Sequence, residues 1–365
     1  MDSVIGSCDV AEGFLRRLNR KVANLRIPLS GSINVTHRCN LRCVHCYLDP
    51  KKINPYQIQN ELSTEKIKRI LDEITEAGCL NLLITGGEPL IRKDFTEIYR
   101  HAKSKGLLIT IFSNGTLITD KILDIFDDLP PKTIEISIYG ATAKTYEKIT
   151  GIKGSYERCI SGIEKLLEHG LNLRLKTILM TINSHELAMM DQMAKDYRVP
   201  FRFDAALFPR FNGDLFPLGL RVSPDKVVDK EFSQKTRRDE WQKFYERYKD
   251  LPISDAKYQC GAGLTYFHID ACGNLQPCLM SIEHQVSLKG ISFSDGWNGE
   301  TPEVRNEKLV PGHMCIDCSK RVLCGYCPPL FQLETNSDQE ISDYMCSMGQ
   351  LRYERLQSMS GRRKL

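Results

Sequence analysis

Three cysteines lie close together near the start of the chain, in the order Cys39-x3-Cys43-x2-Cys46. They follow a short alternation of apolar and polar residues, which predicts a strand that leads into a thiolate-bearing loop. Three thiolates that converge on one point suit an iron–sulfur cluster, and a cluster with only three cysteine ligands leaves one iron open. A zinc site or three buried thiols is the alternative. Zinc usually takes four ligands, however, and His45 lies awkwardly between two of the cysteines.

This cysteine motif resembles the signature of radical S-adenosylmethionine enzymes. The resemblance implies that Cys39, Cys43 and Cys46 hold a [4Fe–4S] cluster whose open iron is chelated by S-adenosylmethionine. It also implies that an electron from the cluster cleaves the sulfonium and yields a 5′-deoxyadenosyl radical. Family members often carry an aromatic residue just before the third cysteine, where this chain has His45. The chain is therefore expected to be an enzyme of the oxidoreductase type.

Strands and helices alternate in the part of the chain that must position these cysteines. Short apolar runs predict six strands near residues 32–35, 81–85, 107–112, 133–138, 172–180 and 201–207, with amphipathic helices between them. This order predicts an α/β fold with a parallel sheet, whose ligands bind at the carboxyl ends of the strands. The resemblance narrows the prediction to the partial (β/α)6 barrel of radical S-adenosylmethionine enzymes.

Polar motifs follow several of the predicted strands. Gly86-Gly87-Glu88-Pro89 combines two glycines, which permit a close backbone approach, with a carboxylate that can accept from an ammonium group. By itself this motif is also an ordinary turn. The resemblance implies that the motif holds the amino group of S-adenosylmethionine. It further places four residues near the ribose or methionine parts: Ser113, Asn114, Ser137 and Lys176. A turn, a strand hydroxyl and a solvated lysine are the ordinary alternatives for these four.

The C-terminal third contains a second concentration of cysteines: Cys260, Cys272, Cys278, Cys315, Cys318, Cys324, Cys327 and Cys346. Eight thiolates can fill two four-ligand sites, and their spacing alone does not separate two clusters from two zinc sites. The region resembles the SPASM extension, which carries auxiliary [4Fe–4S] clusters, although the family commonly has three residues where two separate Cys324 from Cys327.

The resemblance also assigns these cysteines to two auxiliary clusters. Four would hold an outer cluster: Cys315, Cys318, Cys324 and Cys346. Three would hold an inner cluster: Cys260, Cys278 and Cys327. Cys272 is a possible fourth inner ligand, with an open iron as the alternative. Asp270, two residues earlier, is a candidate general base, although an Asp before a Gly-containing turn is routine turn chemistry.

Length and composition bound the remaining possibilities. A chain of 365 residues with 41% hydrophobic residues suits a globular protein. We divide it into five parts: a helical segment (1–31), the barrel (32–207), a bridge (208–254), the SPASM region (255–350) and a tail (351–365). A net charge of +4 gives no case for nucleic-acid binding. No apolar run is long enough for a membrane span, and the N-terminus lacks an export signal. Metal ligation in a reducing cytoplasm is therefore expected.

The resemblance implies an enzyme that oxidatively modifies a peptide or protein, as in the maturation of ribosomally made peptides by thioether or carbon crosslinks. The alternatives are a sulfatase-type maturase, an enzyme that alters tetrapyrrole side chains and, from another class, a non-catalytic iron–sulfur or zinc protein. No leader-binding domain precedes residue 32, so a separate small protein is expected to present a peptide substrate. The resemblance also implies a flavodoxin- or ferredoxin-type electron donor.

Overall fold

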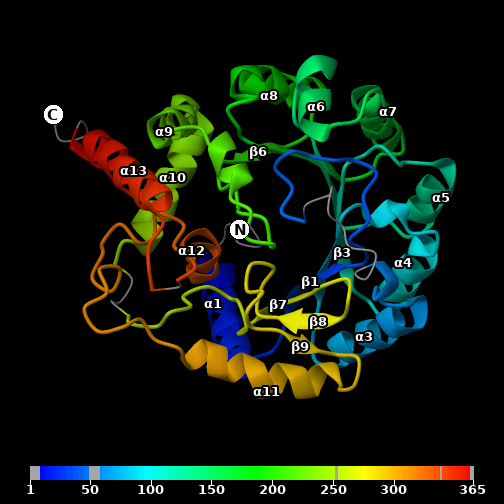
Figure 1. Cartoon of the computed structure of the whole chain (residues 1–365), viewed down its shortest axis with the longest axis horizontal. Coiled ribbons are helices and arrows are strands. Elements are labelled where there is room, and N and C mark those ends of the chain that lie inside the picture. The colour runs from blue at the N-terminus through cyan, green and yellow to red at the C-terminus, as the bar shows by residue number, and fades with distance from the viewer. Residues whose placement is uncertain (1–8, 49–57, 251–253, 338, 362–365) are drawn as a thin grey trace.

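The computed structural model describes residues 9–48, 58–250, 254–337 and 339–361. At its centre lies a nine-stranded sheet in the order β6-β5-β4-β3-β2-β1-β7-β8-β9 (Figure 1). The strands are β1 (Ser30–Asn34), β2 (Asn81–Thr85), β3 (Leu108–Ser113), β4 (Thr133–Ser137), β5 (Leu173–Ile178), β6 (Phe201–Asp204), β7 (Tyr266–Ile269), β8 (Asn274–Gln276) and β9 (Val286–Ser287). Strands β1 to β6 are parallel, which confirms the predicted α/β fold with an unclosed barrel.

Helices connect these parallel strands and cover the outside of the sheet (Figure 1). They are α3 (Thr64–Glu76), α4 (Phe95–Ser104), α5 (Asp120–Asp128), α6 (Ala143–Thr150), α7 (Ser155–Glu168) and α8 (Leu187–Asp196). The sequence analysis did not predict α6, because this segment is short and mostly polar. It begins where the Thr142 side chain accepts from the backbone N–H of Thr145, and it ends at Gly151, whose φ is +68°.

The two faces of the parallel sheet differ in polarity because side chains alternate along each strand. In β4, Ile134 and Ile136 join the hydrophobic core beneath the helices. Glu135 and Ser137 alternate with them and face the inside of the barrel. The barrel interior therefore carries polar side chains, and the apolar core lies between sheet and helices.

The C-terminal cysteine-rich region is continuous with the barrel sheet. Strand β7 pairs in parallel with β1, with Ser32 opposite His268, and β8 and β9 extend the sheet in antiparallel pairing. The close approach depends on Gly31, since a Cβ at this position would lie 2.1 Å from the ring of Phe267. The predicted boundary at residue 255 is therefore not a break in the sheet.

The bridge between the two regions is helical and is fixed by the C-terminal helix. It contains η3 (Phe216–Leu220), α9 (Pro224–Ser233) and α10 (Lys235–Tyr248), and α9 packs on α13 (Asp343–Gly361). Arg352 of α13 forms a buried ion pair with Glu231 of α9 at 2.7 Å. The predicted tail at 351–365 is therefore wrong for residues 351–361, which continue α13.

Three further helices complete the description: α1 (Asp9–Asn24), α11 (Phe293–Asn306) and α12 (Pro328–Thr335). Helix α1 forms where the sequence predicted a helix, and Val22 is buried, but Phe14 and Leu18 are exposed rather than packed on the barrel. The backbone that follows is held by Arg26, whose guanidinium donates to the carbonyl oxygen of Trp297. Among the described residues, no helix combines the length and hydrophobicity that a membrane span needs.

Candidate functional site

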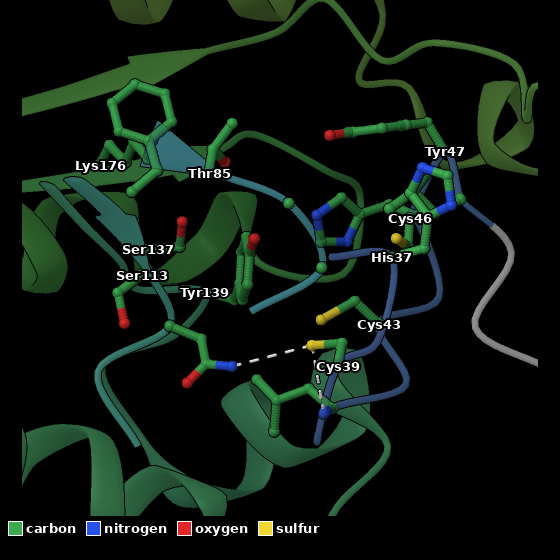
Figure 2. Close-up of a pocket in the computed structure, with 17 residues that line it drawn as sticks. His37, Cys39, Cys43, Cys46, Tyr47, Thr85, Ser113, Ser137, Tyr139 and Lys176 are labelled. Atoms are coloured by element: carbon green, nitrogen blue, oxygen red, sulfur yellow. Dashed lines mark hydrogen bonds between the residues drawn. The ribbon is translucent and has the colours of Figure 1, made fainter. Parts of the chain in front are cut away.

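A cavity of about 160 Å³ lies at the carboxyl ends of the first five strands. Figure 2 shows the residues on its wall. The wall contains most of the residues predicted to hold the first cluster and S-adenosylmethionine: Cys39, Cys43, Cys46, Gly86, Gly87, Ser113, Asn114, Ser137 and Lys176. These residues come from five segments between Cys39 and Lys176, and the parallel sheet brings them to one edge. Glu88, Asp270 and the eight predicted C-terminal cysteines are not on this wall.

The loop that carries the three thiols is held on both sides. On one side, the backbone N–H groups of Arg42 and Val44 donate to Thr150 and Ile149 at the end of α6, at 2.8 and 2.9 Å. On the other side, the backbone N–H of Phe211 in the bridge donates to the carbonyl oxygen of Tyr47 at 3.0 Å. The thiol loop is thus fixed by backbone contacts from two distant parts of the chain.

The three thiols line the same cavity and are partly buried, and this arrangement suits a cationic group. Burial raises the pKa of Cys39 to about 12, although hydrogen bonds from Leu41 and Asn114 oppose the rise. The Cys39 sulfur accepts from the Leu41 N–H at 3.4 Å and from the Asn114 amide at 3.8 Å. Burial, together with the charges of Cys46 and Cys39, also raises the pKa of Cys43 well above its usual value. Thiolates here therefore require a metal-containing partner, and the donor set fits an iron–sulfur cluster.

The Gly86-Gly87 turn packs directly against the thiol loop. Gly86 has φ +146°, and a Cβ here would lie 2.3 Å from the carbonyl oxygen of Thr36. A Cβ on Gly87 would lie equally close to the carbonyl oxygen of Arg38. The backbone N–H groups of Gly87 and Glu88 donate to these same two carbonyl oxygens at 2.8 and 2.9 Å. The two glycines are therefore needed to dock one loop on the other, as well as to approach a ligand.

The Glu88 carboxylate lies behind the cavity wall and is fully buried. It accepts from the Ser113 hydroxyl at 2.9 Å, from the Asn114 N–H at 2.7 Å and from the Leu90 N–H at 3.2 Å. Burial raises the pKa of Glu88 to about 7, against the opposing effect of these hydrogen bonds. A direct bond to a ligand ammonium, as the sequence predicted, would require one of these contacts to be exchanged. In the structure Glu88 instead joins the loops after β2 and β3.

Lys176 reaches the cavity from β5, as the alternation along this strand predicted. Its side chain is only 16% exposed, and its ammonium group lies over the ring of Phe112. Glu135 on the neighbouring strand is 3.5 Å from the same group. The alternative of a solvated lysine is therefore wrong for this residue. Figure 2 shows Lys176 on the side of the cavity away from the thiols.

Several residues on the cavity wall were not predicted from the sequence: His37, His45, Tyr47, Phe112 and Tyr139. The ring of His45 meets the Tyr139 ring edge-on, with centroids 4.7 Å apart. Burial lowers the pKa of His45 to about 4, so the ring is neutral at ordinary pH. Tyr139 comes two residues after Ser137, and the two-residue period of a strand could have identified it.

Charge interactions link the C-terminal thiols in two sets, and their assignment to two clusters stays a prediction. Burial raises the pKa of Cys324 to about 12, and the charges of its three outer partners raise it further: Cys315, Cys318 and Cys346. Burial likewise raises the pKa of Cys278 to about 12, with contributions from Cys327 and Cys260. These interactions join Cys324 to three thiols and Cys278 to two, but within the described residues no three Cys, His, Asp or Glu side chains lie close enough together to hold a metal ion as they stand. Whether these groups hold clusters or zinc depends on chemistry that their spacing does not reveal.

Cys272 does not join the inner group. It lies in the turn between β7 and β8, whereas Cys278 follows the other end of β8. After burial, the groups that shift the pKa of Cys272 are Asp270, Lys289 and Glu61, not the other thiols. The assignment of Cys272 as fourth inner ligand is therefore not supported by this arrangement, because the hairpin separates it from the three.

Asp270 shapes the same turn. One carboxylate oxygen accepts from the backbone N–H groups of Cys272 and Asn274, both at 2.9 Å. The other oxygen accepts from the Asn274 side chain at 2.8 Å. This is the turn chemistry that was the alternative to general-base catalysis. Asp270 still acts on the cavity at a distance, since its charge opposes the effect of burial on the pKa of His37, which does line the wall.

Comparisons with known proteins agree with this geometry. The sequence pattern of the Radical SAM superfamily matches residues 33–196. An AdoMet-dependent heme synthase from Methanosarcina barkeri is 32% identical over 310 residues, which cover 85% of this chain and 80% of that enzyme. The chain belongs to the radical SAM superfamily. This membership implies S-adenosylmethionine and one [4Fe–4S] cluster as cofactors, and it shows that the protein is an enzyme.

Other relatives of this radical SAM enzyme differ in what they act on. The antilisterial bacteriocin subtilosin biosynthesis protein AlbA of Bacillus subtilis is 29% identical over 334 residues, covering 88% of this chain and 71% of that protein. A Fe-coproporphyrin III synthase from Methanosarcina barkeri is 32% identical over 167 residues, only 46% of this chain and 41% of that protein. The solved structure of Streptococcus suis SuiB bound to precursor peptide SuiA shares the fold, with a TM-score of 0.70 at 17% identity over 95% of this chain and 83% of that one.

Proposed function

We propose that this radical SAM enzyme oxidatively modifies a peptide or protein, in the class of reactions that forms thioether or carbon crosslinks. The observation that supports the proposal is a second, C-terminal concentration of cysteines, whose thiols interact in sets of four and three, in addition to the three thiols of the cavity. A radical reaction that ends in a net oxidation needs an acceptor for one electron. Thiol groups able to hold iron–sulfur clusters are suited to that role.

Cys39, Cys43 and Cys46 would hold the cluster of the cavity. With S-adenosylmethionine bound, this cluster supplies the electron that cleaves the sulfonium to a 5′-deoxyadenosyl radical. The Asn114 amide would donate to the Cys39 thiolate, and such hydrogen bonds to sulfur help to set a cluster's potential. Phe112 and Tyr139 on the wall would keep water from the reacting atoms.

The oxidation balances if the substrate loses two hydrogen atoms in two steps. The first hydrogen atom goes to the 5′-deoxyadenosyl radical, which becomes 5′-deoxyadenosine. As the new substrate bond forms, one proton would leave to a base and one electron would be accepted by the oxidised clusters that the C-terminal cysteines would hold. A flavodoxin- or ferredoxin-type protein would exchange electrons with the enzyme, and a separate leader-binding protein would present a peptide. Asp270 is a weak candidate for the base, since its oxygens are bonded within its own turn.

A tetrapyrrole is the second candidate substrate. The similarity to the AdoMet-dependent heme synthase favours it, because that match covers 85% of this chain at 32% identity. The similarity to the subtilosin biosynthesis protein covers 88% of the chain at 29% identity and favours a peptide. Sequence identity therefore does not choose between the two substrates, whereas a direct assay does.

The test offers both substrates to the anaerobically reconstituted enzyme with S-adenosylmethionine and dithionite. One arm contains candidate precursor peptides, taken from short reading frames near this gene, and the other contains iron coproporphyrin. The proposal expects a peptide that has lost a pair of hydrogen atoms, seen by mass spectrometry. Conversion of the porphyrin with no change in the peptide would overturn it in favour of the second candidate.

A double variant tests the proposed oxidative role of the C-terminal thiols separately. Cys315 and Cys318 are both changed to Ala, and far-UV circular dichroism first establishes that the variant is folded. The variant should release 5′-deoxyadenosine but make no mature product, because the substrate radical cannot be oxidised. Normal product formation would show that these thiols are structural, as in a zinc ribbon.

A further inference from the structure

The inner face of three neighbouring strands carries a group of charges beside the cavity. Glu135 lies on β4, Lys176 on β5 and Arg202 on β6, and the register places Lys176 directly opposite Arg202. The Lys176 ammonium is 3.5 Å from Oε2 of Glu135, and the Arg202 guanidinium is 2.8 Å from the same oxygen. Two cations therefore share one carboxylate oxygen, which leaves the group with an excess of positive charge.

The two cations of this group have different surroundings. The Lys176 side chain lines the cavity and is 16% exposed, whereas the Arg202 side chain is 45% exposed and is not on the cavity wall. A guanidinium keeps its charge at any ordinary pH, so Arg202 is a constant neighbour. The charge of a buried ammonium depends instead on its partners. Lys176 is thus the variable member of the group.

The partners of Lys176 act on it in opposite directions. Burial lowers the pKa of Lys176 well below its usual value, the Glu135 carboxylate raises it, and the Arg202 guanidinium lowers it. Burial alone would raise the pKa of Glu135, but the charges of Lys176 and Arg202 outweigh burial and hold it below its usual value. The remaining neighbour, Phe112 of β3, presents an uncharged ring face to the ammonium. Among these neighbours, Glu135 is therefore the one that favours the charged form of Lys176.

We propose that Glu135 is a positioning residue that holds the Lys176 ammonium charged at the cavity wall, where it binds the carboxylate of S-adenosylmethionine. Arg202 opposes Glu135 by competing for the same oxygen. The 3.5 Å separation of Lys176 from Glu135 exceeds the 2.7–2.9 Å of a close charge-assisted bond, which leaves the ammonium able to bond to a second carboxylate. This inference rests on the proposed binding of S-adenosylmethionine in the cavity.

The proposal predicts opposite effects for the two residues that share Lys176. Binding of the ligand carboxylate needs the ammonium form of Lys176, so the affinity for S-adenosylmethionine should fall as the pH rises through the pKa of Lys176. Glu135→Gln removes the group that raises this pKa, so the loss of affinity should begin at lower pH. Arg202→Gln removes a group that lowers it, so the loss should begin at higher pH. A purely structural role for the three residues would not produce shifts of opposite sign.

The experiment measures affinity by anaerobic calorimetry on the reconstituted enzyme across a series of pH values. The probes are S-adenosylmethionine and its decarboxylated form, which lacks the carboxylate. Glu135→Gln should weaken S-adenosylmethionine binding roughly tenfold at the alkaline end, the loss of about one charge-assisted contact, and should leave the decarboxylated probe unaffected. Shifts of the same sign in both variants, or equal effects on both probes, would overturn the proposal.

A further variant keeps the test decisive. Lys176→Arg in the Glu135→Gln background supplies a cation that cannot lose its proton, so binding should recover and become independent of pH. If Glu135→Gln does not fold, the single variants Arg202→Gln and Lys176→Arg still give an upward shift and a flat profile under the proposal. A wild-type enzyme that binds neither probe would contradict the proposed function itself, a result distinct from a failure of the Glu135 role.

Discussion

The backbone N–H of Asn114 donates to Oε2 of Glu88 at 2.7 Å, while the Asn114 side chain reaches in the other direction to the sulfur of Cys39 at 3.8 Å. One residue at the end of β3 thereby contacts both the glycine-containing turn after β2 and the thiol loop after β1. These contacts tie together the three motifs that the sequence marked separately. The shape of the cavity therefore depends on groups that do not line it, and Glu88 is the clearest example.

Glu88→Gln should loosen this junction. An amide NH₂ would face a group of donors, Ser113, Leu90 or Asn114, where a carboxylate now accepts. Hydrogen bonds to a charged group contribute about 1.5–3 kcal/mol, so affinity for S-adenosylmethionine should fall by roughly ten- to a hundred-fold. Calorimetry on the reconstituted enzyme checks the affinity, and urea unfolding checks the accompanying loss of stability.

A matched variant for this prediction is Ser113→Ala, which removes one donor and leaves the carboxylate intact. Its effect should be smaller than that of Glu88→Gln, because the Asn114 and Leu90 bonds remain. Equal affinities in wild type and Glu88→Gln would mean that the turn after β2 does not depend on this carboxylate.

Gly31→Ala should destabilise the joint between the barrel and the C-terminal region. The new Cβ would lie 2.1 Å from the Phe267 ring, which is fully buried and packed against Phe293. Overpacking of this kind typically costs about 1–3 kcal/mol of unfolding free energy, measured by urea denaturation. Gly219→Ala is the control, since nothing lies within 4 Å of its Cβ, and it should change stability by less than about 0.5 kcal/mol.

His268 should make stability depend on pH in the acid range. Burial lowers its pKa to about 3, from an ordinary value of 6.5, with a smaller effect from His37. Between these values the unfolded chain binds a proton that the folded protein does not. Stability should therefore be complete above pH 6.5 and should fall by about 1.4 kcal/mol for each pH unit below it.

The contribution of His268 is isolated by comparing two variants. His268→Asn keeps an acceptor for the Ser32 hydroxyl, which lies 2.7 Å from the ring nitrogen of His268. In this variant, unfolding free energy should depend less steeply on pH below 6.5, by the contribution of one proton. His185→Asn, at a side chain that is 66% exposed, should leave the slope as in wild type. Identical slopes in wild type and His268→Asn would show that the buried ring is protonated in the folded state.

Local patterns predicted the barrel well because each of its units is specified over a short span. The apolar run of Asn81–Thr85 is a strand in the structure, and the face formed by Ile67, Ile70 and Ile74 is buried as an amphipathic helix should be. The thiol motif and the glycine-containing turn were found because their residue types are unusual. Their convergence follows from the parallel sheet, which brings strand ends to one edge.

The features that the sequence did not predict depend on contacts between distant segments. Ser32 and His268 are paired in the sheet but lie far apart in the sequence, so the periodicity of neighbouring residues does not predict their pairing. The separation of Cys272 from the inner thiols follows from hairpin geometry, which cysteine spacing does not contain. Glu88 was expected to contact a ligand because its motif resembles the one that holds the amino group of S-adenosylmethionine, but its carboxylate accepts from donors at the end of β3.

The most direct test of this account is release of 5′-deoxyadenosine. Wild-type enzyme, reconstituted anaerobically and given dithionite and S-adenosylmethionine, should release it, as measured by liquid chromatography. A variant with Cys39, Cys43 and Cys46 all changed to Ala should release none while still binding iron in its C-terminal region, since the cavity thiols are separate from the other two groups. No release from the fully loaded wild type, or full release from the triple variant, would contradict the assignment of the cavity.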